Sequence, residues 1–178
     1  MSATVGVAHT AELDVATLRA ARGLLDDVFG AEMTDDDWEH ALGGVHALVW
    51  EAGQLVGHAA VVQRRLLYRD RALRTGYVEG VAVSPERRRR GYGSAAMDAI
   101  EHVIRGAYEL GALGASDEGA RFYAARGWRP WRGPTWALTR EGLVRTAGDD
   151  DSVFVLEGEL ALDPSEALTC DWRDGELW

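Results

Sequence analysis

Four consecutive arginines and two glycines stand between an apolar segment and an amphipathic one in the middle of the chain. The segment Val78–Gly93 reads VEGVAVSPERRRRGYG, with the arginines at Arg87–Arg90 and the glycines at Gly91 and Gly93. Glycine lets the backbone come close to a ligand, and the N–H groups and dipole at a helix N-terminus attract anions. The spacing lacks the glycine-lysine pair of a P-loop and the third glycine of a Rossmann turn. The segment therefore predicts an anion-binding site.

The charge balance of the chain is acidic. It holds 29 acidic and 19 basic residues, for a net charge of −10 and a pI near 4.9. Such a field repels nucleic acid and anionic lipid and attracts cations. Acidic residues cluster at Asp35–Asp37, at Asp149–Asp151 and in the C-terminal segment, which favours a cationic ligand, although such clusters are usually solvated surface. An arginine-rich helix start and a nucleic-acid patch are the alternatives for the basic segment, and the net charge argues against the second.

The elements that must position these segments show both hydrophobic periods. Strand patterns cover residues 4–9, 46–51, 54–68, 73–83, 110–115, 134–138 and 152–162. Helical patterns cover residues 14–29, the stretch from a Thr34–Asp37 capping box to Leu42, residues 93–109, and a helix from Ser116 to a glycine at Gly127. The segment 73–83 is apolar on both faces, which predicts a central strand. The order, without repeat or linker, predicts an α+β or mixed α/β architecture in one domain.

Several features predict a soluble cytoplasmic protein. Cys170 is the only cysteine, so no internal disulfide forms, and the first ten residues lack the features of a signal peptide. No run approaches the ~20 apolar residues that cross a bilayer. His46 and His58 lie in strand-like stretches, and no metal-ligand spacing surrounds them. We therefore expect no metal, no membrane and no nucleic acid among the partners.

Three segments carry a resemblance to a known family. The strand, proline, basic turn and helix around Val78–Gly93 resemble the coenzyme loop of the GCN5-related N-acetyltransferases (GNAT). Residues 120–128, ARFYAARGW, alone suit core packing, but at this distance they resemble a later helix of that superfamily. The stretches Asp37–Trp50, Tyr77–Val83 and Cys170–Trp178 closely resemble the aminoglycoside 2′-N-acetyltransferases, from about residue 9 to the last residue. The last stretch is the most specific, because general superfamily members lack it.

The resemblance implies the fold, the reaction and the partners. The fold is a single GNAT domain over residues 1–178, with a mixed, mostly antiparallel sheet flanked by helices. The reaction moves acetyl from acetyl-CoA to the 2′-amine of an aminoglycoside, a polycationic small molecule. The resemblance also implies a homodimer.

Site residues are implied position by position. The coenzyme positions are Val81, Ala82, Val83, Arg88, Arg89, Arg90, Gly91, Tyr92 and Gly93. The substrate positions are Glu32, Asp37, Glu79, Gly80, Gly114, Asp149, Asp150, Glu176 and Trp178, the last through its terminal carboxylate. The family allows Asp at the first and eighth of these substrate positions. Some relatives have Gly-Gln where this chain has Arg89-Arg90, which leaves drug specificity open.

The catalytic roles implied are those of Glu79 and Tyr123. An aminoglycoside amine is largely protonated at neutral pH, and Glu79 takes its proton directly or through water; partial burial would raise its pKa and help. Main-chain N–H groups near Val81–Val83 stabilise the oxyanion that attack creates. Tyr123 is the general acid toward the coenzyme sulfur. Transfer is direct, and Cys170 is not a nucleophile.

Two alternatives remain open from the sequence. The first is an acetyl-CoA-dependent N-acetyltransferase that acts on another amino sugar, a polyamine or a protein amine. The second is a non-catalytic acetyl-CoA sensor or a protein that sequesters cationic drugs. Glu79 together with Tyr123 favours catalysis, and the acidic clusters favour a polycation over a neutral amine.

Overall fold

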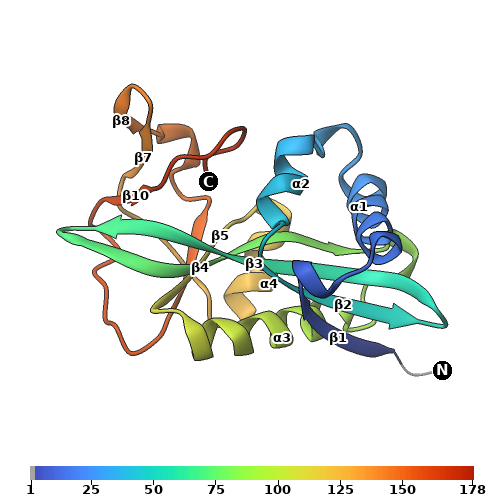
Figure 1. Ribbon diagram of the computed structural model, residues 1–178. Helices are drawn as coiled ribbons and strands as arrows, with labels where there is room; N and C mark the ends of the chain where they lie inside the picture. Colours follow the sequence, from blue (N-terminus) through green and yellow to red (C-terminus); the bar gives the residue numbers. More distant parts are fainter. Residues whose placement is uncertain (1–2) are drawn as a thin grey trace. The chain divides into compact units, whose positions relative to one another are not determined.

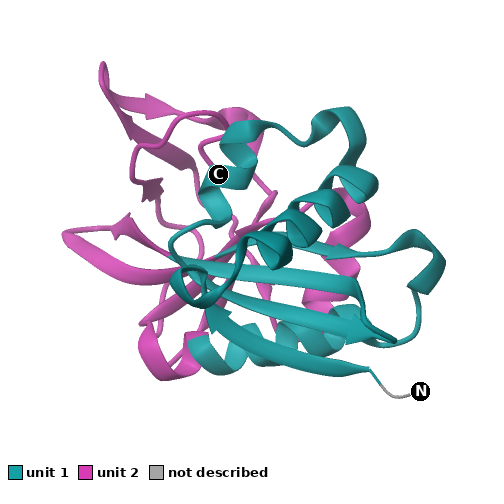
Figure 2. Cartoon of the chain, turned by 45° about the vertical axis from the view of Figure 1, so that its right-hand side comes forward, with its two compact units in different colours: residues 1–62, 78–103 teal, residues 63–77, 104–178 magenta. Residues whose placement is uncertain are grey.

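The computed structural model describes residues 3–178, which divide into two compact units. Figure 2 colours unit 1 (residues up to 62, with 78–103) teal and unit 2 (63–77, with 104–178) magenta. The strands β3 (Gln54–Tyr68) and β4 (Arg71–Val83) run through both units, as does the helix α3 (Tyr92–Ala107) (Figure 1). The prediction of one domain is a separate statement and stays a prediction.

Unit 1 is built on an antiparallel group of strands. The strand β1 (Thr4–His9) pairs with β2 (Val45–Glu51), which pairs with the first part of β3. Ala52 and Gly53 connect β2 to β3 with φ values of 52° and 79°. A two-residue hairpin of type I′ requires positive φ at both positions. The predicted hairpin turn is therefore confirmed.

Two helices cap this group of strands. The helix α1 (Val15–Phe29) begins at Asp14, whose side chain accepts a hydrogen bond from the Thr17 N–H. Its buried face packs against apolar residues of β2, β3 and β4, three elements that Figure 1 labels together with α1. The cluster comprises Ala21, Leu24, Leu25, Leu48, Leu55 and Ala82. The helix α2 (Asp35–Ala41) begins with the predicted capping box, which is confirmed. Short 3₁₀ turns lie at Thr10–Glu12 and Gly30–Glu32.

Unit 2 is a mixed sheet. The strand β5 (Leu110–Gly114) runs parallel to the first part of β4. The strands of the unit run in the order β6, β9, β5, β4, β3, β10, β7, β8. The bounds not yet given are β6 Arg129–Pro130, β7 Thr135–Thr139, β8 Gly142–Arg145, β9 Val153–Glu157 and β10 Leu168–Cys170. The helix α4 (Asp117–Ala125) starts at Ser116, and Gly127 follows it with φ 89°. The predicted cap and the central position of β4 are confirmed.

The C-terminal third differs from the sequence prediction. The strand predicted over 152–162 ends at Glu157, and the sequence analysis missed β6, β8 and β10. β6, β8 and β10 have two to four residues, too few for a periodic pattern to show. The predicted fold class, a mixed sheet with flanking helices, is confirmed.

Candidate active site

Glu79 and Gly80 lie at a distortion near the end of β4. Both residues are half-buried, and Gly80 has φ +57°, in the left-handed region that favours glycine. A Cβ at Gly80 would lie 3.3 Å from Leu25 Cδ1 and 3.4 Å from the His58 ring, so the position is also crowded. The Gly80 carbonyl accepts a hydrogen bond of 2.7 Å from His58 Nδ1. Glu79, the predicted base, therefore directly precedes a glycine with positive φ whose carbonyl is held by a hydrogen bond.

The basic loop follows in the same unit. Pro85–Arg87 forms a 3₁₀ turn, and Arg88–Arg90 are exposed, with Arg89 at φ +61°. Gly91 has φ +84°, no atom within 4 Å of a Cβ placed on it, and a carbonyl that accepts from Ala95 N–H at the start of α3. Exposed guanidinium groups, open space at a glycine and a helix N-terminus suit a diphosphate. These residues therefore fit the diphosphate of coenzyme A.

Tyr123 lies in unit 2 on α4. Its side chain is buried, and its ring makes edge contacts with Phe122 at 5.2 Å and Trp128 at 6.2 Å between centroids. Burial raises the pKa of Tyr123 to about 12. The hydroxyl therefore keeps its proton at neutral pH, the state that a proton donor needs.

An acidic group in unit 2 contains four of the predicted substrate positions, which are Asp149, Asp150, Glu176 and Trp178. Burial, followed by the charges of Glu176 and Asp150, raises the pKa of the Asp149 carboxyl. Trp178 is buried, and its indole N–H donates to Thr146 Oγ1 at 3.0 Å. A Cβ placed on Gly114 would lie 3.5 Å from the carbonyl carbon of Trp178. Repulsion between like charges is relieved by a bound cation, so this group suits a polycation.

Asp150 is tied into the protein itself. Its Oδ1 accepts from Thr135 N–H at 3.0 Å, from Thr135 Oγ1 at 2.9 Å and from Arg145 Nη1 at 2.9 Å, and its Oδ2 forms an ion pair with Arg145 Nη2. The Arg145 hydrogen bond is the largest of the causes that hold the pKa of Asp150 well below its usual range. The Asp150 carboxylate therefore already has partners within the protein, and its predicted contact with a substrate stays a prediction.

The two remaining substrate positions lie in unit 1. Glu32 is exposed at the end of the Gly30–Glu32 turn. Asp37 Oδ2 accepts from Thr34 N–H at 2.9 Å and from Thr34 Oγ1 at 2.7 Å, which is the capping box of α2. Asp37 is thus a helix cap, and any role toward a ligand is additional to it.

The comparisons with known proteins agree with this chemistry. Residues 11–131 match the family described as Acetyltransferase (GNAT) domain. An aminoglycoside 2′-N-acetyltransferase of Mycolicibacterium fortuitum is 51% identical over 179 aligned positions, which cover 98% of this chain and 92% of that protein. The chain belongs to the GNAT family. It is an acetyltransferase, and its similarity to the M. fortuitum protein also places it in the aminoglycoside 2′-N-acetyltransferase family.

Solved structures support the GNAT fold. Escherichia coli ElaA superposes with a TM-score of 0.62 at 22% identity, over 88% of this chain and 100% of that one. An acyl-CoA N-acyltransferase from Pseudomonas aeruginosa has a TM-score of 0.61 at 18% identity, over 86% of this chain and 99% of that one. At these identities the likeness shows the fold alone.

Glu51 organises the arginine-rich loop that is predicted to bind the coenzyme, and the sequence analysis missed it. Glu51 Oε1 accepts from Tyr92 Oη at 2.5 Å and lies 3.8 Å from Arg90 Nη1, while its Oε2 lies 3.2 Å from Arg87 Nη1. The Tyr92 hydrogen bond is the main cause that lowers the pKa of Glu51. One carboxylate at the end of β2 thus holds three residues of the loop, and only the position of Glu51 beside a hairpin turn could have suggested it.

Arg64 anchors the C-terminal segment of this GNAT protein and was also missed. Its side chain is 4% exposed; Nε donates to Asp171 Oδ1 at 2.8 Å and Nη2 to Asp171 O at 2.9 Å. The segment is further held by Cys170 Sγ, which donates to Leu177 O at 3.4 Å, and by Arg173 Nε, which donates to Glu176 O at 2.6 Å. Burial raises the pKa of Cys170 to about 11, so it remains a protonated thiol at neutral pH.

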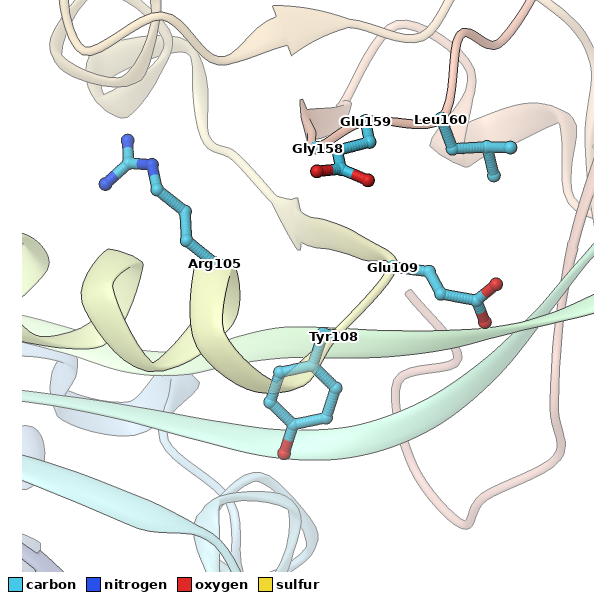
Figure 3. A pocket seen from close by; sticks show the side chains of 6 residues that line it. All are labelled: Arg105, Tyr108, Glu109, Gly158, Glu159 and Leu160. Carbon is cyan, nitrogen blue, oxygen red and sulfur yellow. The ribbon is translucent and has the colours of Figure 1, made fainter.

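Unit 2 also contains a hollow of about 670 Å³ that involves none of the predicted GNAT site residues. Figure 3 shows Arg105 and Tyr108 at the end of α3, and Glu159 and Leu160 after β9. The carboxylate of Glu109, at its edge, already accepts from Arg71 Nη2 at 2.8 Å and from the Arg74 N–H at 2.9 Å. The Glu109 carboxylate, one of the polar groups that line the hollow, is therefore already engaged by donors of the protein itself.

Two kinds of feature are absent from residues 3–178. No group of three or more His, Cys, Asp or Glu side chains in this range is placed to hold a metal ion. None of the described helices is long and apolar enough to span a membrane.

Proposed function

We propose that this acetyltransferase transfers the acetyl group of acetyl-CoA to the 2′-amine of an aminoglycoside. The observation that carries the proposal is the acidic group at Asp149, Glu176 and Trp178, in which proximity and burial already raise the pKa of Asp149. The M. fortuitum relative bears the name of this activity. A net charge of −10 also favours encounter with a polycation.

The coenzyme is held by unit 1 in this proposal. Arg88–Gly93 bind the diphosphate through side chains and main-chain N–H groups. The main chain of Val81–Val83 binds the pantetheine arm and the acyl oxygen. Acetyl-CoA supplies an activated thioester, so the protein needs to orient it and to move protons.

Glu79 and Tyr123 act on two protons, one from the substrate ammonium and one toward the coenzyme sulfur. Glu79 receives the proton of the substrate ammonium, directly or through water, which frees the lone pair of the amine. Tyr123 holds its proton at Oη and presents it to the coenzyme sulfur. An ordinary thiol has a pKa of about 8.5, which is below the pKa of Tyr123. The largest contribution of Tyr123 is therefore a hydrogen bond to the coenzyme sulfur as negative charge develops there.

The substrate is held by several carboxylates rather than by one. An exposed ion pair contributes about 0–1 kcal/mol, so useful affinity requires several pairs that are partly shielded from water. Asp149 and Glu176 supply such charges, with Glu32 and Asp37 as further contacts. The terminal carboxylate of Trp178 supplies another charge, and Gly80, Gly114 and Asp150 supply backbone or side-chain contacts.

A thiol-release assay tests the proposal. Purified protein with acetyl-CoA should release thiol with a drug that carries a 2′-amine, such as gentamicin or tobramycin. It should release none with a drug that carries a 2′-hydroxyl and a 6′-amine. Equal rates with both would defeat the 2′ assignment and favour a broader amine acetyltransferase. A homodimer and a cytoplasmic location remain predictions.

A further inference from the structure

Three polar side chains of unit 1 form a hydrogen-bonded chain that ends at the Gly80 carbonyl. Thr10 Oγ1 lies 2.7 Å from His46 Nε2, His46 Nδ1 lies 3.0 Å from His58 Nε2, and His58 Nδ1 lies 2.7 Å from Gly80 O. Both histidines are fully buried. His46 lies on β2 and His58 lies on the neighbouring strand β3, and the mechanism proposed above uses neither residue.

Gly80 determines the direction of every bond in this chain. A carbonyl oxygen only accepts, so His58 must carry its proton on Nδ1, and neutral His58 accepts at Nε2. His46 must then donate from Nδ1 and accept at Nε2, which leaves Thr10 Oγ1 as the donor to His46. Thr10 Oγ1 in turn accepts from the Gly43 N–H at 3.0 Å. The Gly44 carbonyl, 3.2 Å from Thr10 Oγ1, is the other acceptor within reach of the Thr10 hydroxyl, but it already accepts from the Thr10 N–H at 2.9 Å.

Both rings are neutral at neutral pH, as this arrangement requires. Burial lowers the pKa of both His46 and His58 to about 4. The charge of His9 lowers the pKa of His46 further, and the Gly80 hydrogen bond partly opposes the lowering at His58. The charge of His46 also lowers the pKa of His58. The direction of each hydrogen bond between Thr10 and Gly80 is therefore constant around neutral pH.

The Gly80 carbonyl shares a rigid peptide plane with the Val81 N–H. In a trans peptide these two groups point in opposite directions, so a bond that holds the carbonyl also sets the direction of the N–H. Glycine accepts a rotated peptide easily, and at φ +57° Gly80 provides little resistance of its own. A hydrogen bond from a buried, fixed imidazole supplies that resistance.

We propose that His58, held in turn by His46 and Thr10, is a positioning residue for acetyl transfer, because it fixes the Gly80–Val81 peptide plane, whose N–H meets the acyl oxygen and which lies one residue after Glu79. The inference rests on the proposed roles of Val81 and Glu79. It assigns the buried pair of histidines to the reaction rather than to packing alone.

A matched pair of variants tests this role. In His58→Asn the amide replaces Nδ1 and can still donate to Gly80, whereas in His58→Gln it replaces Nε2 and keeps only the bond to His46. We expect kcat to fall about 100-fold in His58→Gln and less than about fivefold in His58→Asn, since a misplacement of about 1 Å can cost about 100-fold. The KM for acetyl-CoA should change less than about twofold. Equal losses, or the reverse order in variants with wild-type thermal unfolding, would overturn the proposal.

Nitrogen-15 NMR of the unmodified protein gives a second test that needs no variant. Both histidines should carry their proton on Nδ1 and should not titrate between about pH 5.5 and 8, because burial lowers the pKa of both to about 4. A proton on Nε2 of His58 would overturn the proposal whether or not the variants fold. If the protein acetylates no drug at all, the proposed function fails, while this spectrum still decides the geometry.

Discussion

The coenzyme loop Arg87–Gly93 and the C-terminal segment Cys170–Trp178 carry opposite charge and reach their structures in different ways. The loop is local: its arginines, its glycines and the start of α3 are consecutive in the sequence. The C-terminal segment has almost no regular structure, and its anchor, Arg64, lies 107 positions before Asp171. The difference teaches that the residues of the predicted anion site are consecutive and are held by one distant side chain, Glu51, whereas the predicted site for cations is positioned mainly by contacts made far along the chain.

Removing the anchor of the C-terminal segment should have the largest effect. Arg64→Ala leaves Asp171, 38% exposed, without its buried partner, so we expect a loss of about 2–4 kcal/mol in the free energy of unfolding. The KM for the drug should rise about tenfold while that for acetyl-CoA stays constant, if coupling to the acidic group is worth about 1.4 kcal/mol. Urea unfolding and steady-state kinetics measure these changes.

Arg69→Ala is the control for this prediction. Arg69 lies on the turn after β3 and pairs with Glu166, but both partners are exposed, by 55% and 42%. Such a pair contributes about 0–1 kcal/mol, so this variant should keep nearly wild-type stability and both KM values. A similar drug KM in the two variants would separate Arg64 from the substrate site.

The coenzyme loop should respond in the opposite manner. Arg88→Ala removes one charged hydrogen bond to the diphosphate, worth about 1.5–3 kcal/mol, so the KM for acetyl-CoA should rise about 10–100-fold. The drug KM and the unfolding free energy should remain close to wild type. Arg19→Ala, an exposed arginine of α1, is the control for the loss of one positive charge. An increase in drug KM instead would contradict the division between the two regions.

Asp149→Asn should have the smallest effect, and its sign is informative. The pKa of Asp149 is raised in the folded protein, so its contribution to stability is present below its unfolded pKa and is lost as the pH rises through the folded one. At pH 7 the asparagine variant should therefore melt slightly higher, although its drug KM rises about fivefold through the loss of about 1 kcal/mol of ion pairing.

The pH dependence of the wild-type protein checks the same assignment. Drug affinity should weaken as the pH falls through the raised pKa of Asp149, because the protonated carboxyl no longer attracts the drug's ammonium groups. In Asp149→Asn this weakening should be reduced. Calorimetric titration of both proteins over acidic pH measures it, and identical pH profiles would remove Asp149 from the binding site.

Local signals account for what the sequence analysis predicted. The Thr34–Asp37 capping box, the hairpin turn at Ala52-Gly53 and the glycine after α4 each depend on a few neighbouring residues, and each is found. The positions of Glu79, the arginine loop and Tyr123 within their elements follow from the same short patterns.

Long-range partners account for what it missed. Glu51 acts on a loop about 40 positions away, and the Arg64–Asp171 pair spans 107 positions. The hydrogen bonds from Arg145 and Thr135 to the Asp150 carboxylate were not foreseen either, and the role of Asp150 as a substrate contact stays a prediction. The sequence analysis interpreted His46 and His58 only as structural histidines, because the hydrogen bond between them depends on which strands pair. No local pattern contains such information.

The position of the acetyl group in the product tests the central claim most directly. Tobramycin carries amines at both the 2′ and 6′ positions, so one reaction offers the enzyme a choice. We predict that two-dimensional NMR of the mono-acetylated product shows the new amide at the 2′ nitrogen. Acetylation at the 6′ nitrogen, or a mixture of positions, would contradict the account.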